Sequence, residues 1–318
     1  MYSYGNDGFV HFSAASVMCV WKINCTFAVV MTYQELWHKL VPKYDPREAQ
    51  AVVRVLLDGL FDMSLTDIVG GKVTELSAES QQLIEEKLKE IQSGVPVQYV
   101  LGFEWFAGRR FAVNPSVLIP RPETAELCSM IVADHDRPFC CLEPPVPLRV
   151  LDVGTGSGCI AVTLSLDIPN SAVEAWDISG DALLTARDNA RRLHASVDFR
   201  LRDILDADAL PAGGDAAYDV IVSNPPYICC KERATMADNV VNHEPGLALF
   251  VPDDDPLRFY SAIASYALRS LRKGGGLYFE VNALYAGDVA AMLRERGFSS
   301  ATVRKDQFGM NRFVVATL

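Results

Sequence analysis

The chain has 318 residues, of which half are apolar and 22% are charged, and its formal net charge is -11. This length allows two domains with a sizeable core, and the acidic balance argues against a protein that relies on long phosphate tracts, because such binding needs clustered Lys and Arg. The eight cysteines and five histidines show no C-x-x-C pair and no metal-ligand spacing, so we expect reduced thiols, a cytoplasmic location and no metal.

Residues 1–30 show neither a signal peptide nor a membrane span. The apolar stretch Phe9–Val30 is interrupted by polar residues such as Lys22 and has no basic segment before it. We expect residues 1–30 to be a non-native or upstream extension, with the natural start at Met31.

Residues 31–98 are expected to form a small helical domain that docks a partner. Asp45 followed by Pro46 is typical of a helix start, and apolar residues then recur at helical spacing. A later helix is predicted from Ser77 to Gly94, with an inward face made of Leu83, Ile84, Leu88 and Ile91.

Residues 99–120 predict a linking β-hairpin. Tyr99–Phe103 and Arg110–Asn114 flank a turn at Gly108. The prolines of Leu118-Ile-Pro-Arg-Pro-Glu-Thr124 forbid regular structure, and the next helix is expected to begin at Glu123 or Thr124.

Residues 121–318 predict an α/β domain with a doubly wound, mainly parallel, seven-stranded Rossmann-like sheet. A proline-rich loop at 132–147 precedes a regular alternation of strands and helices. The last two strands share a short link and should form an antiparallel hairpin at the sheet edge. The predicted strands are 148–153, 172–177, 197–201, 218–223, 276–281, 300–305 and 312–317, and the predicted helices are 158–167, 179–193, 256–272 and 284–296.

A glycine-rich turn follows the first of these strands. It runs through Gly154, Thr155, Gly156, Ser157 and Gly158, and its glycines let the backbone approach a ligand. The spacing differs from the G-x-G-x-x-G dinucleotide fingerprint. The Asp152 carboxylate just before it would repel a pyrophosphate but suits a cationic ligand such as S-adenosylmethionine (SAM). A tight turn without a ligand is the alternative.

Acidic residues end the next two strands. Asp177 can accept hydrogen bonds from both hydroxyls of a ribose. Asp203 can accept from an adenine amino group, and Ile204 can pack on the ring. The alternative for both acids is a solvated strand end.

Asn224-Pro-Pro-Tyr227 follows the strand 218–223. Ligands bind at the carboxyl edge of such sheets, and Asn offers both a donor and an acceptor. Pro225 and Pro226 fix the backbone and Tyr227 adds a flat wall, so the tetrapeptide could clamp a planar nitrogen group. A proline-stiffened turn is the alternative.

Together these motifs resemble class I SAM-dependent methyltransferases and, more narrowly, the peptide chain release factor glutamine methyltransferases (the PrmC/HemK family). Asn-Pro-Pro-Tyr alone also occurs in DNA adenine methyltransferases. The resemblance covers about residues 31–318 and rests on an ordered set of segments: Pro96-Val-Gln-Tyr-Val-Leu-Gly102, Phe106, Ile119-Pro-Arg-Pro-Glu-Thr124, Asp152-Val-Gly-Thr-Gly-Ser-Gly158 and Asn224-Pro-Pro-Tyr-Ile228.

The resemblance implies methylation of the side-chain amide nitrogen of glutamine in the Gly-Gly-Gln motif of class I release factors, with S-adenosylhomocysteine as the second product. It implies SAM contacts from Gly154 to Gly158, Asp177, the Asp203–Ile204 pair and Asn224. It implies that Asn224 and Pro225 hold the substrate amide in the catalytic step. The rest of the substrate pocket would be formed by Pro226, Tyr227 and Phe106, with Arg121 to Glu123 closing the site or touching SAM.

The residue types fit this chemistry. A carboxamide nitrogen is a poor nucleophile, and nothing in the motifs resembles a strong base. The Asn224 side-chain oxygen and the Pro225 carbonyl can each accept one amide hydrogen, which would orient the nitrogen toward the methyl group.

Some positions depart from the family pattern. Glu280-Val-Asn282 stands where the family often has Glu-x-Gly, the loop at 132–147 is longer than expected, and Cys229-Cys230 directly follows Asn-Pro-Pro-Tyr-Ile. His243-Glu244-Pro245 resembles a Glu-Pro element that we interpret as structural.

We expect a monomer that acts on a release factor without membrane contact or direct nucleic-acid binding. One alternative is a methyltransferase for exocyclic amines of nucleic acids with a flipped-out base, which should bring a basic channel. The other is a non-catalytic SAM-binding module.

Overall fold

The computed structural model describes residues 31–135, 146–208, 210–211 and 217–318. The expectation for residues 1–30 and the pair Cys140-Cys141 therefore lie outside the described residues. Across the described ranges, no helix combines the length and the apolar character needed to cross a membrane.

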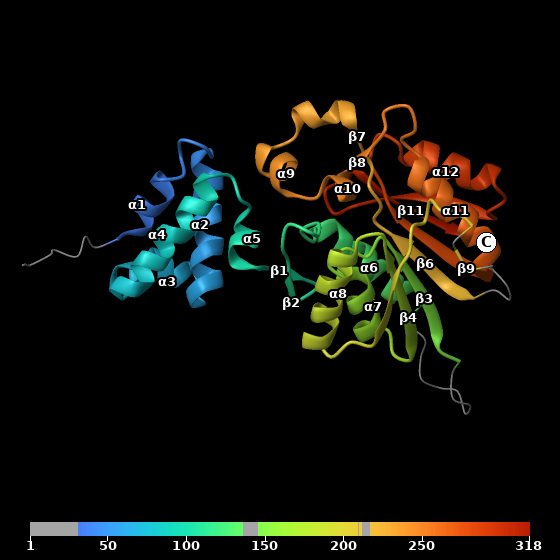
Figure 1. Cartoon of the computed structure of the whole chain (residues 1–318), viewed down its shortest axis with the longest axis horizontal. Coiled ribbons are helices and arrows are strands. Elements are labelled where there is room, and N and C mark those ends of the chain that lie inside the picture. The colour runs from blue at the N-terminus through green and yellow to red at the C-terminus, as the bar shows by residue number, and fades with distance from the viewer. Residues whose placement is uncertain (1–30, 136–145, 209, 212–216) are drawn as a thin grey trace, which may run out of the picture.

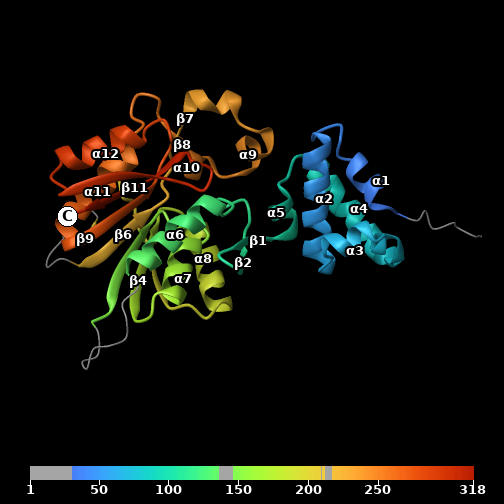
Figure 2. The same ribbon diagram turned by 180° about the vertical axis from the view of Figure 1, so that it is seen from behind.

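The N-terminal part is a helical unit with its own core. It contains α1 (Tyr33–His38), α2 (Pro46–Phe61), α3 (Leu65–Val69), a 3-10 helix (Lys72–Glu75), α4 (Ala78–Gln92) and α5 (Val97–Leu101). The Asp45 side chain caps α2 by accepting from the amides of Arg47 and Glu48. Figures 1 and 2 show this unit beside the α/β part.

One inward residue of α4 was predicted wrongly. Ile84, Leu88 and Ile91 are at most 1% exposed, but Leu83 is 37% exposed. The three buried positions are four and three residues apart, so they form one narrow stripe on the helix, and Leu83 lies about 100° away from Ile84 around the axis.

The expected strand Tyr99–Phe103 is also wrong, because Val97–Leu101 form helix α5. The helix ends at Gly102, whose φ of 78° is the left-handed conformation of a helix C-terminus. Tyr99 Oη donates to the carbonyl of Val117 at 2.6 Å, which ties the helix to the next segment. A short apolar run does not distinguish a strand from a buried helix.

The hairpin itself is present but shifted along the chain. Strand β1 (Phe103–Phe106) pairs antiparallel with β2 (Arg109–Ala112). Gly108 lies in the turn as predicted, with a φ of 74°.

The seven-stranded sheet confirms the predicted fold class. Its order is β10-β11-β9-β6-β3-β4-β5, and β11 is antiparallel to both of its neighbours. The hairpin of the last two strands lies at one edge, as expected. The strands are β3 (Leu148–Val153), β4 (Ser171–Asp177), β5 (Val197–Leu201), β6 (Tyr218–Ser223), β9 (Leu271–Glu280), β10 (Ser300–Lys305) and β11 (Asn311–Thr317).

Helices cover both faces of the sheet because neighbouring residues of a strand point to opposite sides. Val150 packs in the core under α6 (Pro122–Asp134), α7 (Cys159–Asp167) and α8 (Gly180–Arg192). Leu151 packs in the core under α11 (Arg258–Ser270) and α12 (Ala286–Glu295). Helix α6 continues through residues 132–134, where we expected the start of a loop.

An insertion between β6 and α11 was not predicted. It comprises β7 (Ile228–Cys229), a 3-10 helix (Cys230–Thr235), α9 (Asp238–His243), α10 (Gly246–Leu249) and β8 (Phe250–Val251). Each element is at most six residues long, too short to show a hydrophobic period. Figure 1 places α9 near α5, between the helical unit and the sheet.

Asn189 on α8 fastens the hairpin to the α/β part. It is 1% exposed. Its Nδ2 donates to the carbonyls of Ala112 at 3.0 Å and Ser157 at 2.9 Å, and its Oδ1 accepts from the Ala112 amide at 2.7 Å. One side chain thus joins α8, the hairpin and the glycine-rich turn.

We predict that Asn189→Ala lowers the free energy of unfolding by about 2–4 kcal/mol, because it leaves buried backbone groups without partners. Urea denaturation measures this. Asp188→Ala, at the neighbouring half-buried position where the side chain pairs only with surface arginines, should change stability by less than about 1 kcal/mol. Equal effects of the two substitutions would contradict the role assigned to Asn189.

Candidate functional site

A cavity of about 360 Å³ lies at the carboxyl ends of the parallel strands. The chain continues from β3 to β4 on one side, whereas β6 pairs with β3 on the other. This reversal of strand order is where open α/β sheets bind ligands. Seven residues singled out from the sequence line the cavity: Gly154, Gly156, Asp177, Asp203, Ile204, Pro225 and Pro226.

The glycine-rich turn contributes two of its five residues to the cavity wall. Thr155 and Ser157 are buried, at 4% and 2% exposed, and do not line the cavity. Gly158 is close to α8 instead, since a Cβ on it would lie 3.0 Å from the Cβ of Ala186. The turn therefore needs small residues both for an open cavity wall and for helix packing.

Asp177 lies in the cavity wall with its carboxylate fixed by backbone amides. Oδ2 accepts from Gly156 at 2.8 Å and Oδ1 accepts from Ser179 at 2.8 Å. Burial raises the pKa of Asp177, and these amide hydrogen bonds counteract the rise. A carboxylate oxygen accepts more than one hydrogen bond, so Asp177 can still bind hydroxyl groups of a ligand.

Asp203 and Ile204 line the same cavity beyond β5. Asp203 Oδ1 accepts from the Leu205 amide at 2.9 Å, which holds the turn in shape. Ile204 packs against the core on the α11 face of the sheet. An acid and an apolar side chain therefore stand next to each other at this end of the cavity.

Asp152 lies below the glycine-rich turn and is fully buried. Its Oδ2 accepts from Thr155 Oγ1 at 2.6 Å and from the Ala161 amide at 3.2 Å, whereas Oδ1 has no partner among the described residues. Burial is the largest of the effects that raise the pKa of Asp152 to about 7. A positive charge in the neighbouring cavity would favour the ionised form.

The Asn224–Tyr227 segment follows β6 on the other side of the cavity. Ser223 Oγ donates to the Val153 carbonyl at 2.6 Å, which ties the end of β6 to the end of β3. Pro225 and Pro226 line the cavity, and Asn224 and Tyr227 lie just outside its wall. Asn224 Oδ1 and the Pro225 carbonyl accept no hydrogen bond from the described residues, so both acceptors are available.

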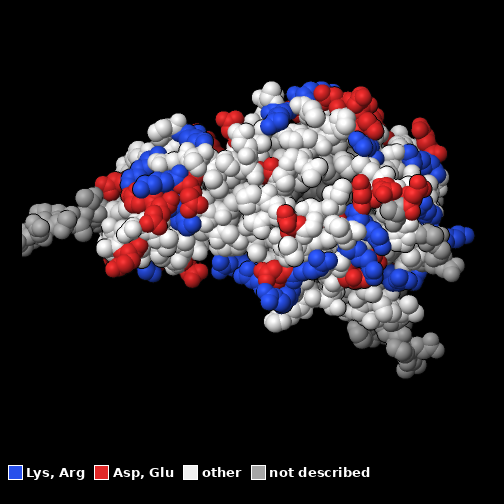
Figure 3. All heavy atoms as spheres, in the orientation of Figure 1, with Lys and Arg blue, Asp and Glu red and all other residues white. Residues whose placement is uncertain are grey.

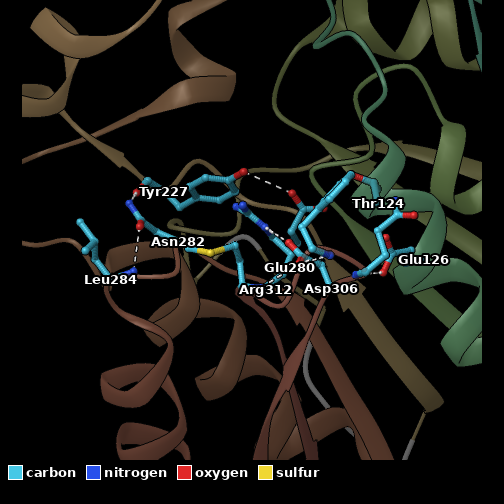
Figure 4. A network of polar contacts seen from close by, with 11 residues as sticks. Thr124, Glu126, Tyr227, Glu280, Asn282, Leu284, Asp306 and Arg312 are labelled. Atoms are coloured by element: carbon cyan, nitrogen blue, oxygen red, sulfur yellow. Dashed lines mark hydrogen bonds and ion pairs between the residues drawn. The ribbon is translucent and has the colours of Figure 1, made fainter.

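A buried carboxylate behind this segment was not recognised as part of the site from the sequence. Glu280 is 1% exposed; its Oε2 accepts from Thr124 Oγ1 at 2.6 Å and its Oε1 accepts from Tyr227 Oη at 3.2 Å. Thr124 also accepts from Asn224 Nδ2 at 3.2 Å. Figure 4 shows Thr124 and Tyr227 approaching Glu280 from different segments. Thr124 belongs to the Leu118–Thr124 segment and Glu280 to the Glu280–Asn282 segment, but the sequence did not indicate that the two side chains meet.

Arg121 and Glu244 form an ion pair beside the site, and neither of them lines the cavity. Arg121 Nη2 lies 2.5 Å from Glu244 Oε1, and Glu244 Oε2 accepts from the Ile119 amide at 3.2 Å. The Glu244 side chain is only 1% exposed. It joins the proline-rich segment to the insertion that supplies Pro245 and Phe250 to the cavity wall, which fits the structural interpretation of Glu244.

Phe106 does not reach the cavity. It is 2% exposed and packs edge-on against Phe111, with 5.7 Å between the ring centroids. The structure therefore places it in the core under α6 and α7, and a direct substrate contact from Phe106 has no geometric support.

The surface shows no long basic tract on the face seen in Figure 3, where Lys and Arg are interspersed with Asp and Glu and the central region is largely uncharged. Within the described ranges, no group of three or more His, Cys, Asp and Glu side chains is placed to hold a metal ion.

Two family models match the chain. Residues 38–102 match the PrmC N-terminal domain, and residues 140–245 match the methyltransferase small domain.

Full-length relatives are also similar. The release factor glutamine methyltransferase of Bacteroides thetaiotaomicron is 44% identical over 273 residues, which is 86% of this chain and 94% of the relative. The release factor glutamine methyltransferase of Lactococcus lactis is 34% identical over 85% of this chain and 93% of the relative.

Among solved structures, a release factor-specific protein-(glutamine-N5) methyltransferase from Alicyclobacillus acidocaldarius is 31% identical. The match covers 65% of this chain and 98% of that chain, with a TM-score of 0.39.

The buried Asp152 predicts a specific pH dependence of stability. Its folded-state pKa of about 7 lies above the ordinary aspartate value of 3.8, so between these values the folded state binds more protons and stability falls as pH rises. Asp152→Asn removes this loss. Between pH 5 and pH 8, the free energy of unfolding of the ligand-free protein should therefore fall by about 2–3 kcal/mol more than that of the Asp152→Asn variant. Urea denaturation of both proteins at several pH values measures this difference. Parallel curves of unfolding free energy against pH would contradict the prediction.

Proposed function

The chain belongs to the family of release factor glutamine methyltransferases, and from this premise we propose that it transfers a methyl group from SAM to the side-chain amide nitrogen of the glutamine in the Gly-Gly-Gln motif of class I release factors. The observation that carries the proposal is the pair of free acceptors, Asn224 Oδ1 and the Pro225 carbonyl, at the edge of a cavity whose other wall is the glycine-rich turn.

The side chains at the cavity have the chemistry needed to bind SAM. Asp177 offers an amide-fixed carboxylate suited to ribose hydroxyls, and Asp203 with Ile204 offers an acceptor and an apolar surface suited to adenine. The buried Asp152 below Gly154 and Gly156 favours a cation. Bound SAM supplies an activated methyl group on a sulfonium.

The chain's own residues bind and orient the substrate nitrogen. A glutamine amide has two hydrogens, and the Asn224 oxygen and the Pro225 carbonyl can each accept one of them. With both hydrogens held, the orientation of the amide plane is fixed, and the nitrogen lone pair, which is perpendicular to that plane, faces the methyl group. The same acceptors stabilise positive charge that develops on nitrogen as the new N–C bond replaces the S–C bond of the methyl donor, and the methylated nitrogen then releases one of its two hydrogens to water as a proton. Positioning and electrostatics therefore take the place of a strong catalytic base.

The cavity walls have separate roles in this proposal. Gly154 and Gly156 border the methionine part of SAM, whereas Thr155, Ser157 and Gly158 shape the turn from within. Pro226 and Tyr227 support the substrate side. Phe106 acts only through packing, and the Arg121–Glu244 pair holds the insertion against the cavity.

We propose residues 31–98 as the unit that docks the release factor, 99–120 as the linker and 121–318 as the catalytic domain. A cytoplasmic monomer that does not bind nucleic acid directly is the form that we expect to act.

We predict that the purified protein, given SAM with a labelled methyl group, labels a class I release factor. Replacement of glutamine by alanine in the Gly-Gly-Gln motif of that factor should abolish the labelling, because the acceptor nitrogen is then absent. Scintillation counting of the separated factor measures it. Labelling of nucleic acid in place of the factor would overturn the proposal in favour of an exocyclic-amine methyltransferase.

We also predict that Asn224→Ala reduces kcat by about 100-fold or more, an effect of the size seen when one preorganised transition-state contact is lost. The affinity for SAM, measured by calorimetry, should change by less than about 3-fold, since Asn224 lies outside the cavity wall. Asp177→Asn, in the part of the cavity proposed to bind the ribose of SAM, is the comparison variant. It should weaken SAM binding by about 10-fold or more, because a charge-assisted hydrogen bond is lost. Equal turnover by Asn224→Ala would show that the amide clamp is wrong.

A further inference from the structure

We propose that Thr124 is a positioning residue that sets the orientation of the Asn224 carboxamide, with the buried Glu280 as its anchor. This inference rests on the proposed function, because it names the group that makes Asn224 an acceptor for the substrate amide. Thr124 is 100 residues away from Asn224 and 156 from Glu280 in the sequence, so only the fold brings the three together.

The direction of the hydrogen bonds follows from what each group can donate. A threonine hydroxyl has one hydrogen, and a carboxylate only accepts. Thr124 Oγ1 lies 2.6 Å from Glu280 Oε2, so its hydrogen is used on Glu280. The lone pairs of the same oxygen then face Asn224 at 3.2 Å, and the group of Asn224 that meets them must be the NH₂ end.

This arrangement decides which end of Asn224 remains for the substrate. With Nδ2 held by Thr124, Oδ1 is the end without a partner among the described residues. If the carboxamide turned over, Oδ1 would meet the lone pairs of Thr124, and the NH₂ group would face the substrate. A donor there would compete for the nitrogen lone pair that must attack the methyl group, so that orientation is unproductive.

The anchor is itself rigid. Glu280 is 1% exposed, and its second oxygen accepts from Tyr227 Oη at 3.2 Å. The backbone carbonyl of Glu280 accepts from Tyr260 Oη at 3.2 Å. Thr124 is 2% exposed and lies in the first turn of α6. Water therefore has little access to compete for the hydroxyl, and a buried hydrogen bond to a carboxylate is stronger than an exposed one.

The orientation matters for the rate more than for binding. The release factor docks through a larger surface than one amide, so loss of the Thr124 hydroxyl leaves SAM affinity and the KM for the factor nearly unchanged. It allows Asn224 to spend time in the unproductive orientation, which lowers kcat. A residue that served only the stability of α6 would not produce this division between kcat and KM.

The test compares Thr124→Val, which keeps the shape and removes the hydroxyl, with Thr124→Ser, which keeps the hydroxyl. Rates of release factor methylation with labelled SAM should show kcat reduced by about 10-fold or more for the valine variant. The serine variant should stay within about 3-fold of the unsubstituted chain. For both variants, the Kd for SAM and the KM for the factor should change by less than about 3-fold.

Thr163→Val is the matched control. Thr163 on α7 is also buried, at 1% exposed, and its Oγ1 has no hydrogen-bond partner in the part of the chain that the structure describes. The same substitution there should leave kcat unchanged.

Three results would overturn the inference while leaving the proposed function intact: an unchanged kcat in Thr124→Val, an equal loss in the valine and serine variants, or an equal loss in Thr163→Val. Absence of release factor labelling by the unsubstituted protein would instead overturn the proposed function, and the role of Thr124 with it.

Discussion

The parallel pairing of β3 with β6 is the constraint on which the site depends. Val150, Leu151 and Asp152 lie opposite Val220, Ile221 and Val222, so the two strands end side by side. The glycine-rich turn after β3 and the Asn224 segment after β6 therefore meet at one edge, and the Ser223–Val153 hydrogen bond fixes the spacing between them. A one-residue slip would send every side chain of a strand to the opposite face, so the burial of both faces protects this register.

Two buried acids at the site are unfavourable for the stability of the fold. Asp152 and Glu280 are almost completely removed from solvent, and burial raises the pKa of each. Hydrogen bonds from Thr155 to Asp152 and from Thr124 to Glu280 offset part of that cost. Acids whose pKa values are raised by burial at one edge of a sheet are typical of functional sites. Here one acid lies below the cofactor side of the cavity, and the other lies behind the residues proposed to hold the substrate amide.

Most of the α/β part could be predicted because its strands and helices are long and show a clear period, as in β3, β5, β6 and β10, whose predicted and observed limits agree. Most of the wrong predictions concern short segments, but the long strand β9 also begins at Leu271, five residues before the predicted limit of 276. Tyr99–Leu101 has the composition of a strand, but Gly102 and the bond from Tyr99 to Val117 make it part of a helix. The insertion at 228–251 has no period at all. Phe106 belongs to a motif of the family, yet its neighbours place it in the core.

The sequence by itself determined the family, the fold class and the positions of the glycine-rich turn and the Asn224–Tyr227 segment, because these depend on contiguous residues whose types and order are distinctive. Only the tertiary structure decided which groups act together. Thr124, Asn224 and Glu280 come from three distant parts of the chain, and Arg121 meets Glu244 across a gap of 123 residues. Hydrogen-bond direction depends on distance and on competing donors, and neither can be read from residue order.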